Sequence, residues 1–236
     1  MLTVITCTGD REIAFGLCRR WMQNQTIKPD QWIIIDDGQI PTIISKPEDY
    51  VHYIRRQPDP NCREVTLILN LKMALPLIKG DKILIMEDDE YYAPRYIEEM
   101  SGRLDSYEVV GIGNAKYYHL QAGGYKCCGN TNNASLAETG FRSSFLPIFS
   151  ECVYSIKNTP WLDILLWKQV RNSKEISSLI FFDVDGTLFV GVKSLPGREG
   201  IGVGHKKGFY RKFDVDRSVL RNWIPKDYSI YLDLLK

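Results

Sequence analysis

Short apolar runs alternate with helical patterns along the first part of the chain. The runs consist mainly of uninterrupted Ile, Leu, Val and Trp, which is typical of strands that a parallel sheet buries on both faces. Between them, Ile13, Leu17 and Trp21 recur every four residues, as on one face of a helix. This alternation predicts an α/β fold with a parallel sheet covered by helices on both faces. The predicted strands are residues 2–7, 32–35, 50–54 and 82–86, and the predicted helices are residues 12–24 and 63–78.

The pattern becomes mixed beyond Pro94. A helix is expected to end near Leu104, and a second amphipathic helix to begin at Pro160. The glycine- and asparagine-rich residues 123–133 are expected to form a loop that can close over a ligand. Two further apolar runs, at residues 108–112 and 178–182, predict additional strands. No internal repeat or low-complexity linker divides the chain, which favours a single domain over residues 1–236.

Composition narrows the class of protein. With 44% hydrophobic residues, the 236-residue chain can bury a substantial core. It has neither a basic leader followed by an apolar stretch nor an 18-residue apolar segment, so we expect a cytoplasmic protein without membrane contact, in the host cytoplasm if the source is viral. The six cysteines are scattered, and the vicinal pair Cys127-Cys128 has no zinc-type spacing, so reduced thiols are expected.

The net charge of +1 is unevenly distributed. Residues 193–236 contain ten Lys and Arg against five Asp and Glu, whereas residues 1–192 contain 20 against 24. An anionic partner is therefore expected to meet the C-terminal segment, through the phosphates of a nucleotide or of a nucleic acid. The alternative is a solvated basic surface with no partner.

Carboxylates gather where two predicted strands end. Asp36-Asp37 follows one strand, and Glu87-Asp88-Asp89 follows another. The carboxyl ends of parallel strands share one edge of a sheet, and that edge is where α/β folds bind ligands. Because like-charged carboxylates repel in a cleft, a divalent cation such as Mg²⁺ or Mn²⁺ is expected there. The alternative is a solvated acidic turn.

Several short motifs recur in an order that resembles a known family. They lead from the first strand into its helix, then to the two acidic strand ends, and lie within residues 4–11, 24–26, 35–38, 70–74 and 80–89. In order and spacing they resemble the inverting GT-A glycosyltransferases of the large family that contains cellulose, chitin and hyaluronan synthases, with a viral or phage-type member among the alternatives. The resemblance covers roughly the first hundred residues. It implies a GT-A fold and a nucleotide-sugar donor, with UDP as the default nucleotide.

The resemblance also implies a set of nucleotide-binding residues. Thr6, Thr8 and Asp10 would line the nucleoside pocket, and Asp36 or Asp37 would accept a hydrogen bond from the base. Where the family often has an Arg-Asn pair, this sequence has Asn70 and Lys72, and its acidic motif begins with Glu87 where the family usually has Asp. The complete expected nucleotide set is Thr6, Thr8, Asp10, Arg11, Asp36, Asp37, Asn70, Lys72 and Asp88.

Catalysis in that family combines a metal with one carboxylate that deprotonates the acceptor hydroxyl. The resemblance implies Asp89 as the metal ligand, with Glu87 beside it and His205 as a further ligand. The segment Phe182-Asp183-Val184-Asp185 stands where the family has its Glu-Asp pair, so Asp183 is the expected base and Asp185 the reserve. The glycine-rich residues before His205 are expected to form a flap that brings the next two residues, Lys206 and Lys207, to the phosphates.

Taken with the resemblance, these features predict a metal-dependent glycosyltransferase. Residues 1–105 are expected to bind the nucleotide-sugar, residues 106–192 to hold the acceptor and catalytic groups, and residues 193–236 to form a basic flap or tail. The acceptor stays open among DNA, protein and glycan; a hydroxymethylated DNA base would suit a small cytosolic enzyme.

Two other enzyme classes compete with this interpretation. The string Asp183-Val184-Asp185-Gly186-Thr187 matches the signature of haloacid-dehalogenase-like phosphatases, but that fold places most of its core after the motif and only 48 residues follow Leu188. Nucleotidyltransferases share the sheet and the metal carboxylates. They are expected to have a glycine-rich phosphate loop after the first strand, and Thr8-Gly9-Asp10-Arg11 has a single glycine.

A non-enzymatic alternative is a nucleic-acid-binding module. It would use basic residues of the C-terminal segment with aromatic residues among them. This alternative accounts for the basic segment and leaves the acidic strand ends without a role. Its residues would be Lys206, Lys207, Arg211, Lys212, Arg217 and Arg221, with Phe209, Tyr210 and Trp223.

Overall fold

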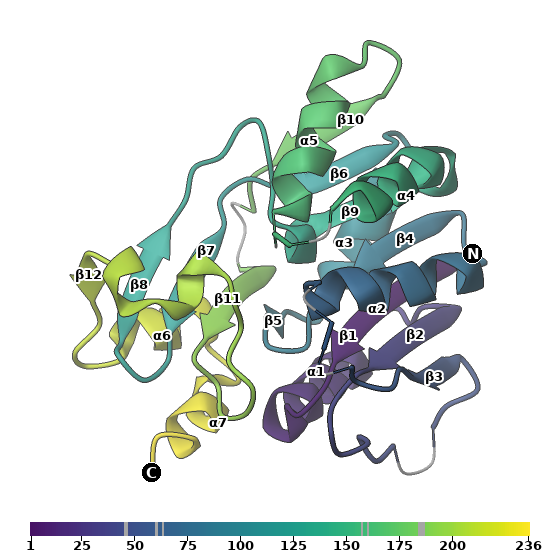
Figure 1. Cartoon of the computed structure of the whole chain (residues 1–236). Coiled ribbons are helices and arrows are strands. Elements are labelled where there is room, and N and C mark those ends of the chain that lie inside the picture. Colours follow the sequence, from purple (N-terminus) through teal and green to yellow (C-terminus); the bar gives the residue numbers. More distant parts are fainter. Residues whose placement is uncertain (45–46, 60, 63, 157, 160, 184–186) are drawn as a thin grey trace.

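A computed structural model describes residues 1–44, 47–59, 61–62, 64–156, 158–159, 161–183 and 187–236. Its larger sheet has seven strands in the order β10-β6-β9-β4-β1-β2-β3, and every neighbouring pair is parallel except those that include β9 (Figure 1). The carboxyl ends of β1, β2 and β4 therefore share one edge. The strands are β1 (Leu2–Thr8), β2 (Gln31–Asp36), β3 (Val51–Arg55), β4 (Lys82–Ile85), β6 (Val109–Ile112), β9 (Thr139–Arg142) and β10 (Ser178–Phe181).

Helices cover both faces of this sheet because successive side chains of its strands point to opposite sides. Val4 belongs to a buried cluster with α1 (Glu12–Asn24) and α3 (Tyr96–Arg103). The next residue, Ile5, belongs to a second cluster on the other face. That face is covered by α2 (Thr66–Ala74), α4 (Leu146–Ser155) and α5 (Leu162–Asn172).

A smaller sheet lies beside the larger one, in the order β12-β8-β7-β11-β5 (Figure 1). Its strands are β5 (Tyr91–Tyr92), β7 (Lys116–His119), β8 (Gly124–Cys127), β11 (Phe189–Lys193) and β12 (Lys212–Phe213). The last helices are α6 (Ser218–Trp223) and α7 (Tyr228–Asp233), and short 3-10 turns are η1 (Leu75–Leu77), η2 (Leu136–Glu138), η3 (Ser143–Phe145), η4 (Val203–His205) and η5 (Lys207–Phe209).

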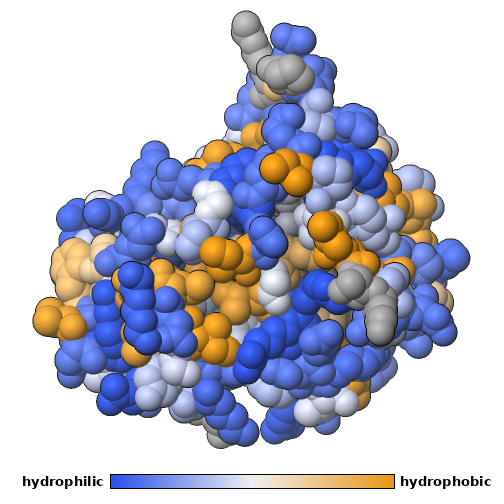
Figure 2. All heavy atoms as spheres, turned by 90° about the horizontal axis from the view of Figure 1, so that it is seen from below, coloured by the Kyte–Doolittle hydropathy of each residue, from blue (hydrophilic) through white to orange (hydrophobic). Residues whose placement is uncertain are grey.

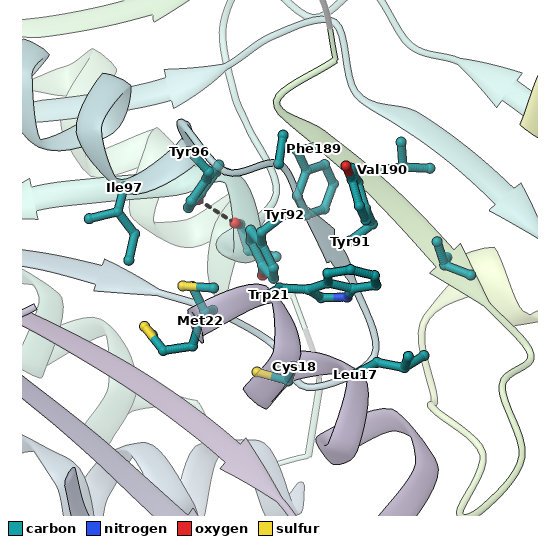
Figure 3. Close-up of a cluster of buried hydrophobic side chains, with 14 of the residues drawn as sticks. Leu17, Cys18, Trp21, Met22, Tyr91, Tyr92, Tyr96, Ile97, Phe189 and Val190 are labelled. Atoms are coloured by element: carbon teal, nitrogen blue, oxygen red, sulfur yellow. Dashed lines mark hydrogen bonds between the residues drawn. The ribbon is translucent and has the colours of Figure 1, made fainter. Parts of the chain in front are cut away.

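An aromatic cluster packs the two sheets together (Figure 3). Trp21 of α1 meets Tyr91 of β5 edge to face, with ring centroids 5.0 Å apart, and stacks on Tyr231 of α7 at 6.2 Å. Tyr92 meets Phe189 of β11 at 5.5 Å. Aromatic side chains bury large apolar areas and prefer these geometries, so the cluster fixes the end of β4 against the smaller sheet.

The structure confirms the predicted α/β alternation and each strand predicted in residues 1–105. The predicted helix at residues 63–78 is α2 followed by η1, while Pro160, the expected start of the later helix, lies outside the described residues. The expectation of a loop at residues 123–133 is wrong in part, because residues 124–127 form β8. There the pairing of Tyr125 with Tyr118 and Lys212 outweighs the local glycine signal. All six cysteines are free thiols.

The surface is largely polar. Figure 2 shows hydrophilic residues over most of the face seen from below, with apolar residues near its centre. Among the described residues, no helix combines the length and the apolar composition that crossing a bilayer requires.

Candidate active site at the carboxyl edge of the sheet

The two acidic motifs lie at the same edge of the larger sheet. Thr8, at the end of β1, pairs in register with Asp36 of β2, and Ile5 pairs with Ile85 of β4. The residues after β4 therefore project beside those after β1 and β2. The sequence prediction that the two acidic motifs share one edge is confirmed.

Arg11 ties the turn after β1 to the acidic residues after β4. Its guanidinium donates to Asp88 at 2.6 Å and lies 3.2 Å from Asp89. The Thr8 hydroxyl donates to the other Asp88 oxygen at 2.7 Å. Both carboxylates are buried, with 1% of Asp88 and 5% of Asp89 exposed, so these contacts offset the cost of removing them from water.

Three of the acidic side chains could share one cation. Oxygen atoms of Glu87, Asp89 and Glu90 all lie within 4.8 Å of one another. His205, on η4, places Nε2 3.6 Å from Asp89 Oδ2, and its buried Nδ1 has no hydrogen-bond partner among the described residues. Burial, followed by the charge of Lys193, lowers the pKa of His205 to about 4, so its imidazole is neutral at pH 7. Neutral imidazole and carboxylate oxygens are the donors that Mn²⁺ accepts.

The charges of the cluster also fit a divalent cation. The four consecutive acidic residues 87–90 face two buried cations, Arg11 and Lys193. Burial raises the pKa of Glu87 to about 7, while Glu90 accepts a hydrogen bond from the Lys193 ammonium group. Burial acts in the same direction on Asp89, but Lys193, Arg11 and His205 outweigh it and hold the Asp89 pKa below its usual value. The cluster would ionise fully only with additional positive charge, which Mg²⁺ or Mn²⁺ would supply.

Asp36 is occupied by hydrogen bonds within its own loop. It accepts from the amides of Gly38 and Thr42, at 2.8 and 2.7 Å, and from the Tyr53 hydroxyl at 2.6 Å. Burial acts to raise the pKa of Asp36, but these donors and Arg55 lower it below its usual value. Asp36 thus holds the turn after β2.

Asp37 lies between two guanidinium groups. Arg56 donates to one oxygen at 2.6 Å and Arg198 to the other at 2.7 Å. Arg56 also donates to the Asn70 side chain, so Asn70 is brought to this part of the site. Asp10, in the turn after β1, accepts a hydrogen bond from the Gln39 amide, after β2, at 2.8 Å.

The remaining predicted nucleotide residues are more distant from these contacts. Thr6 is buried, and its hydroxyl accepts from the Trp32 indole at 2.9 Å on the core side of β1. Lys72 forms an ion pair with Glu64 at 2.6 Å. Their roles in nucleotide binding stay predictions.

Asp183 lies in a different network. One of its oxygens accepts from Asn114 at 2.5 Å and from Lys116 at 3.3 Å, and the other accepts from the Leu188 amide at 2.8 Å. These contacts join the segment after β10 to the start of β11 and to the residues around the start of β7. Asp185, the reserve base, lies outside the described residues, as does most of the phosphatase-like motif.

Two cavities open along the carboxyl edge, and Arg198 lines both. The larger, of about 560 Å³, extends from the acidic cluster, with Arg11, Asp89 and His205 in its wall. The smaller, of about 160 Å³, lies between Asp37 and Arg56. Such adjoining pockets suit a ligand with two chemically distinct ends.

The wall between the cavities is formed in part by Arg198, a residue that the sequence did not single out. The Arg198 amide donates to the Asp10 carbonyl at 2.9 Å, and Arg11 donates to the Arg198 carbonyl at 2.8 Å. Gly197 has a positive φ of 115°, and a Cβ at Gly200 would lie 2.1 Å from the His205 ring. We call residues 194–205 the strap. The glycine-rich residues before His205, which were expected to form a flap, lie within the strap, and Arg198 joins the strap to the turn after β1. Closure of the flap stays a prediction.

Two further carboxyl groups had no sequence signal. Glu138, next to the start of β9, is completely buried, and burial raises its pKa to about 8. Asp163 stands in the first turn of α5, and burial raises its pKa as well. Since α5 leads back to the start of β10, its first turn lies at the carboxyl edge of the sheet. Only this three-dimensional placement distinguishes the two from other acidic residues.

One lysine without an ion-pair partner among the described residues borders the larger cavity. This lysine is Lys207, on the short turn η5. The Lys126 ammonium group, from β8, lies 4.0 Å from the ring centroid of Phe209, which is also on η5. Tyr210 and Trp223 are buried, with 2% and 8% exposed, so they are not open to stacking. We call Lys126, Lys206, Lys207, Arg211 and Lys212 the basic rim; within the described parts of the chain none of them has a carboxylate within 4.0 Å.

Comparison with solved structures defines the fold class. TarS of S. aureus, a GT-A glycosyltransferase, matches in its complex with UDP-GlcNAc with a TM-score of 0.53 and 13% identity, over 99% of this chain and 65% of that one. Its complex with UDP matches with a TM-score of 0.54 and 13% identity, over 82% and 60%. This chain thus spans 60 to 65% of those TarS fragments. No protein-family model and no curated protein matches the sequence. The chain has a GT-A-like fold, as the sequence predicted.

Proposed function

We propose that this protein is a metal-dependent glycosyltransferase that moves a sugar from a nucleoside diphosphate to an acceptor hydroxyl, with inversion. The observation that carries the proposal is the pair of cavities at the carboxyl edge of a GT-A-like sheet, one of them lined by Asp89 of the acidic cluster and by a neutral histidine. Nucleotidyltransferases would use a similar edge. They need a phosphate loop after the first strand, and here Asp10 and Arg11 take that position with their side chains bound to Gln39 and Asp88.

The donor would extend across both cavities. Its nucleoside would enter the smaller cavity beside Asp37 and Arg56, and its diphosphate would pass Arg198 toward the acidic cluster. Arg198 is 36% exposed and offers a planar set of donors that suits phosphate. Lys207 lines the far side of the larger cavity, and Lys206 is its neighbour. We take UDP as the default nucleotide because TarS binds UDP and UDP-GlcNAc.

The metal would be held by Asp89, Glu87 and His205. When bound, Mn²⁺ or Mg²⁺ supplies positive charge that stabilises the leaving diphosphate. Arg11 would keep Asp89 and Asp88 oriented, because it contacts both.

Two carboxylates compete for the role of base. Asp183 is the residue that the sequence favoured, but its described contacts are with structural neighbours, Asn114 and Leu188 among them. Asp163 stands at the carboxyl edge, in the first turn of a helix, and burial raises its pKa, which makes a carboxylate a stronger base. We retain Asp183 and add Asp163 as the second candidate.

For the acceptor, we propose DNA that carries a hydroxymethylated base. Lys207 of the basic rim lines the larger cavity, so a phosphodiester backbone bound along the rim would bring a base to the reaction centre. Replacing Lys206, Lys207 and Arg211 with Gln should weaken DNA binding and reduce its salt dependence, with Lys174, Lys226 and Lys236 changed to Gln as the control. An unchanged salt dependence would move the acceptor to a neutral glycan or a protein.

The proposal as a whole is tested by calorimetry and a donor-hydrolysis assay. Wild-type protein should bind UDP more tightly with Mn²⁺ than with EDTA, and should release UDP from a UDP-sugar only when the metal is present. CDP, GDP and ADP serve as matched nucleotides for the same measurement. Binding of none of these diphosphates, with or without Mn²⁺, would rule out the proposed function.

A further inference from the structure

Lys193 is a buried lysine in the middle of the acidic cluster. It is the last residue of β11 and only 8% of it is exposed. Its ammonium group donates to Glu90. Its aliphatic stem lies under the strap, where a Cβ at Gly204 would be 3.2 Å from Lys193 Cγ. One side chain thus contacts both the acidic residues after β4 and the turn that carries His205.

The ammonium group stays charged in this environment. Burial acts to lower the pKa of Lys193, but Glu90, Asp89 and Glu87 together raise it far more. The groups that face it from other elements are Asp89, Glu87 and Glu90 after β4, His205 on η4 and Glu138 beside β9. Of these, only His205 can become a cation, and it is neutral at pH 7. Because its ammonium group forms a buried ion pair with Glu90, Lys193 places a positive charge next to the carboxylates that would hold a metal.

A positive charge at this position has two opposite effects. It offsets repulsion among the buried carboxylates when no metal is present, because unpaired buried charges are strongly destabilising. It also repels any cation that binds to Glu87 and Asp89, since the charges are close and partly shielded from solvent. Arg11 supplies a second positive charge on the side toward β1, where its guanidinium is bound to Asp88 and lies 3.2 Å from Asp89.

We propose that Lys193 is the resident counter-ion of the acidic cluster. It stabilises the cluster before a divalent cation binds, and it lowers the affinity for that cation to a level at which the metal arrives and leaves with the nucleotide. This inference rests on the proposed metal-dependent function. A phosphate-bearing ligand adds negative charge and so restores metal affinity, which couples the binding of the two.

The test replaces Lys193 with Met, which keeps the stem over Gly204 and removes the charge. Isothermal titration with Mn²⁺ alone should give about tenfold tighter binding in Lys193→Met than in the wild type. The metal-free variant should melt at a lower temperature than the wild type, and Mn²⁺ should restore more of its stability. The additional tightening of Mn²⁺ binding by UDP should be smaller in the variant.

Two controls separate charge from shape. Lys193→Arg keeps the charge and should leave Mn²⁺ affinity near the wild-type value, while Lys82→Met removes a lysine that pairs with Asp105 away from the site and should change nothing. If Lys193→Met folds only with Mn²⁺, chelation should unfold it, and that result supports the counter-ion role. If it does not fold even with Mn²⁺, Lys193→Gln is measured in its place.

The outcomes distinguish the two proposals. Equal or weaker Mn²⁺ binding in the folded neutral variants would overturn the role of Lys193 and leave the transferase proposal intact. Wild-type protein that binds UDP but no Mn²⁺ would overturn the metal dependence, and the counter-ion role with it.

Discussion

The guanidinium of Arg11 lies 2.6 Å from the Asp88 carboxylate, and both Asp88 and its neighbour Asp89 are buried. The same side chain donates to the Arg198 carbonyl at 2.8 Å. Arg11 therefore joins the turn after β1, the acidic residues after β4 and the strap, which are far apart in sequence.

Removing Arg11 should destabilise the protein. In Arg11→Met, the buried Asp88 carboxylate would keep only the hydrogen bond from the Thr8 hydroxyl. Removing one partner of a buried ion pair typically lowers the free energy of unfolding by about 3–5 kcal/mol. Chemical denaturation measures this loss in the free energy of unfolding. Arg95→Met is the matched control, because Arg95 is 64% exposed and pairs with glutamates on the surface of α3, where the expected loss is below about 1 kcal/mol. Similar losses in the two variants would contradict the bridging role.

Asp89→Asn should abolish metal-dependent donor hydrolysis. The substitution keeps the shape and removes a charged oxygen that faces His205 and Arg11. Turnover is measured over a range of Mn²⁺ concentrations, and circular dichroism reports whether the fold is kept. Asp233→Asn, at an exposed pair with Lys236, should behave as wild type. Full activity of Asp89→Asn would remove Asp89 from the metal site.

Arg198→Gln should weaken binding of the nucleoside diphosphate more than that of the nucleoside. Loss of a charged hydrogen bond to phosphate corresponds to about 1.5–3 kcal/mol, or roughly ten- to a hundredfold in Kd. Calorimetry with UDP and with uridine separates the two contributions. An equal loss for both ligands would place Arg198 at the base, together with Asp37.

Asp36 should stabilise the fold in a pH-dependent manner. Its pKa is lower in the folded protein than in the unfolded chain, so its contribution is fully present above the unfolded value of about 3.9 and is lost as the pH falls through the folded value. Asp36→Asn should therefore lower the Tm at pH 7, and the difference from wild type should shrink below about pH 4. Asp105→Asn, 69% exposed, is the control. A difference that is constant with pH would show that packing, and not charge, is responsible.

The two candidate bases should separate in a pair of variants. Asp163→Asn should reduce kcat strongly with little change in Tm if Asp163 removes the acceptor proton. Asp183→Asn should lower the Tm, because its carboxylate accepts hydrogen bonds from Asn114 and from the Leu188 amide. The opposite pattern, with turnover lost only in Asp183→Asn, would restore the residue favoured by the sequence.

The sequence revealed the strand-turn motifs of residues 1–105 because their signals are local. An uninterrupted apolar run such as residues 82–86 has to be buried, and the carboxylates that follow it have to emerge at an edge. For that reason the sequence alone predicts that Asp36 and Asp88 lie at the same edge of the sheet.

The smaller sheet was less predictable, because its strands are short and their partners are distant in sequence. β5 has two residues and pairs with β11, so neither Tyr92 nor Val190 carries a periodic signal of its own. The pairing of Lys193 with Glu90 and of Arg198 with Asp37 likewise depends on how distant segments meet. No spacing rule connects such residues in a single sequence.

The stack of Trp21 on Tyr231 has a consequence for how the protein is made. Trp21 lies on the helix that follows the first strand, so it leaves the ribosome early, whereas its partner is synthesised more than two hundred residues later. Until Tyr231 emerges, one side of the Trp21 indole has no cover, and the nascent chain exposes an aromatic surface that suits a chaperone. The strands of residues 1–105 can form during translation, but the core around Trp21 closes only after translation has passed α7.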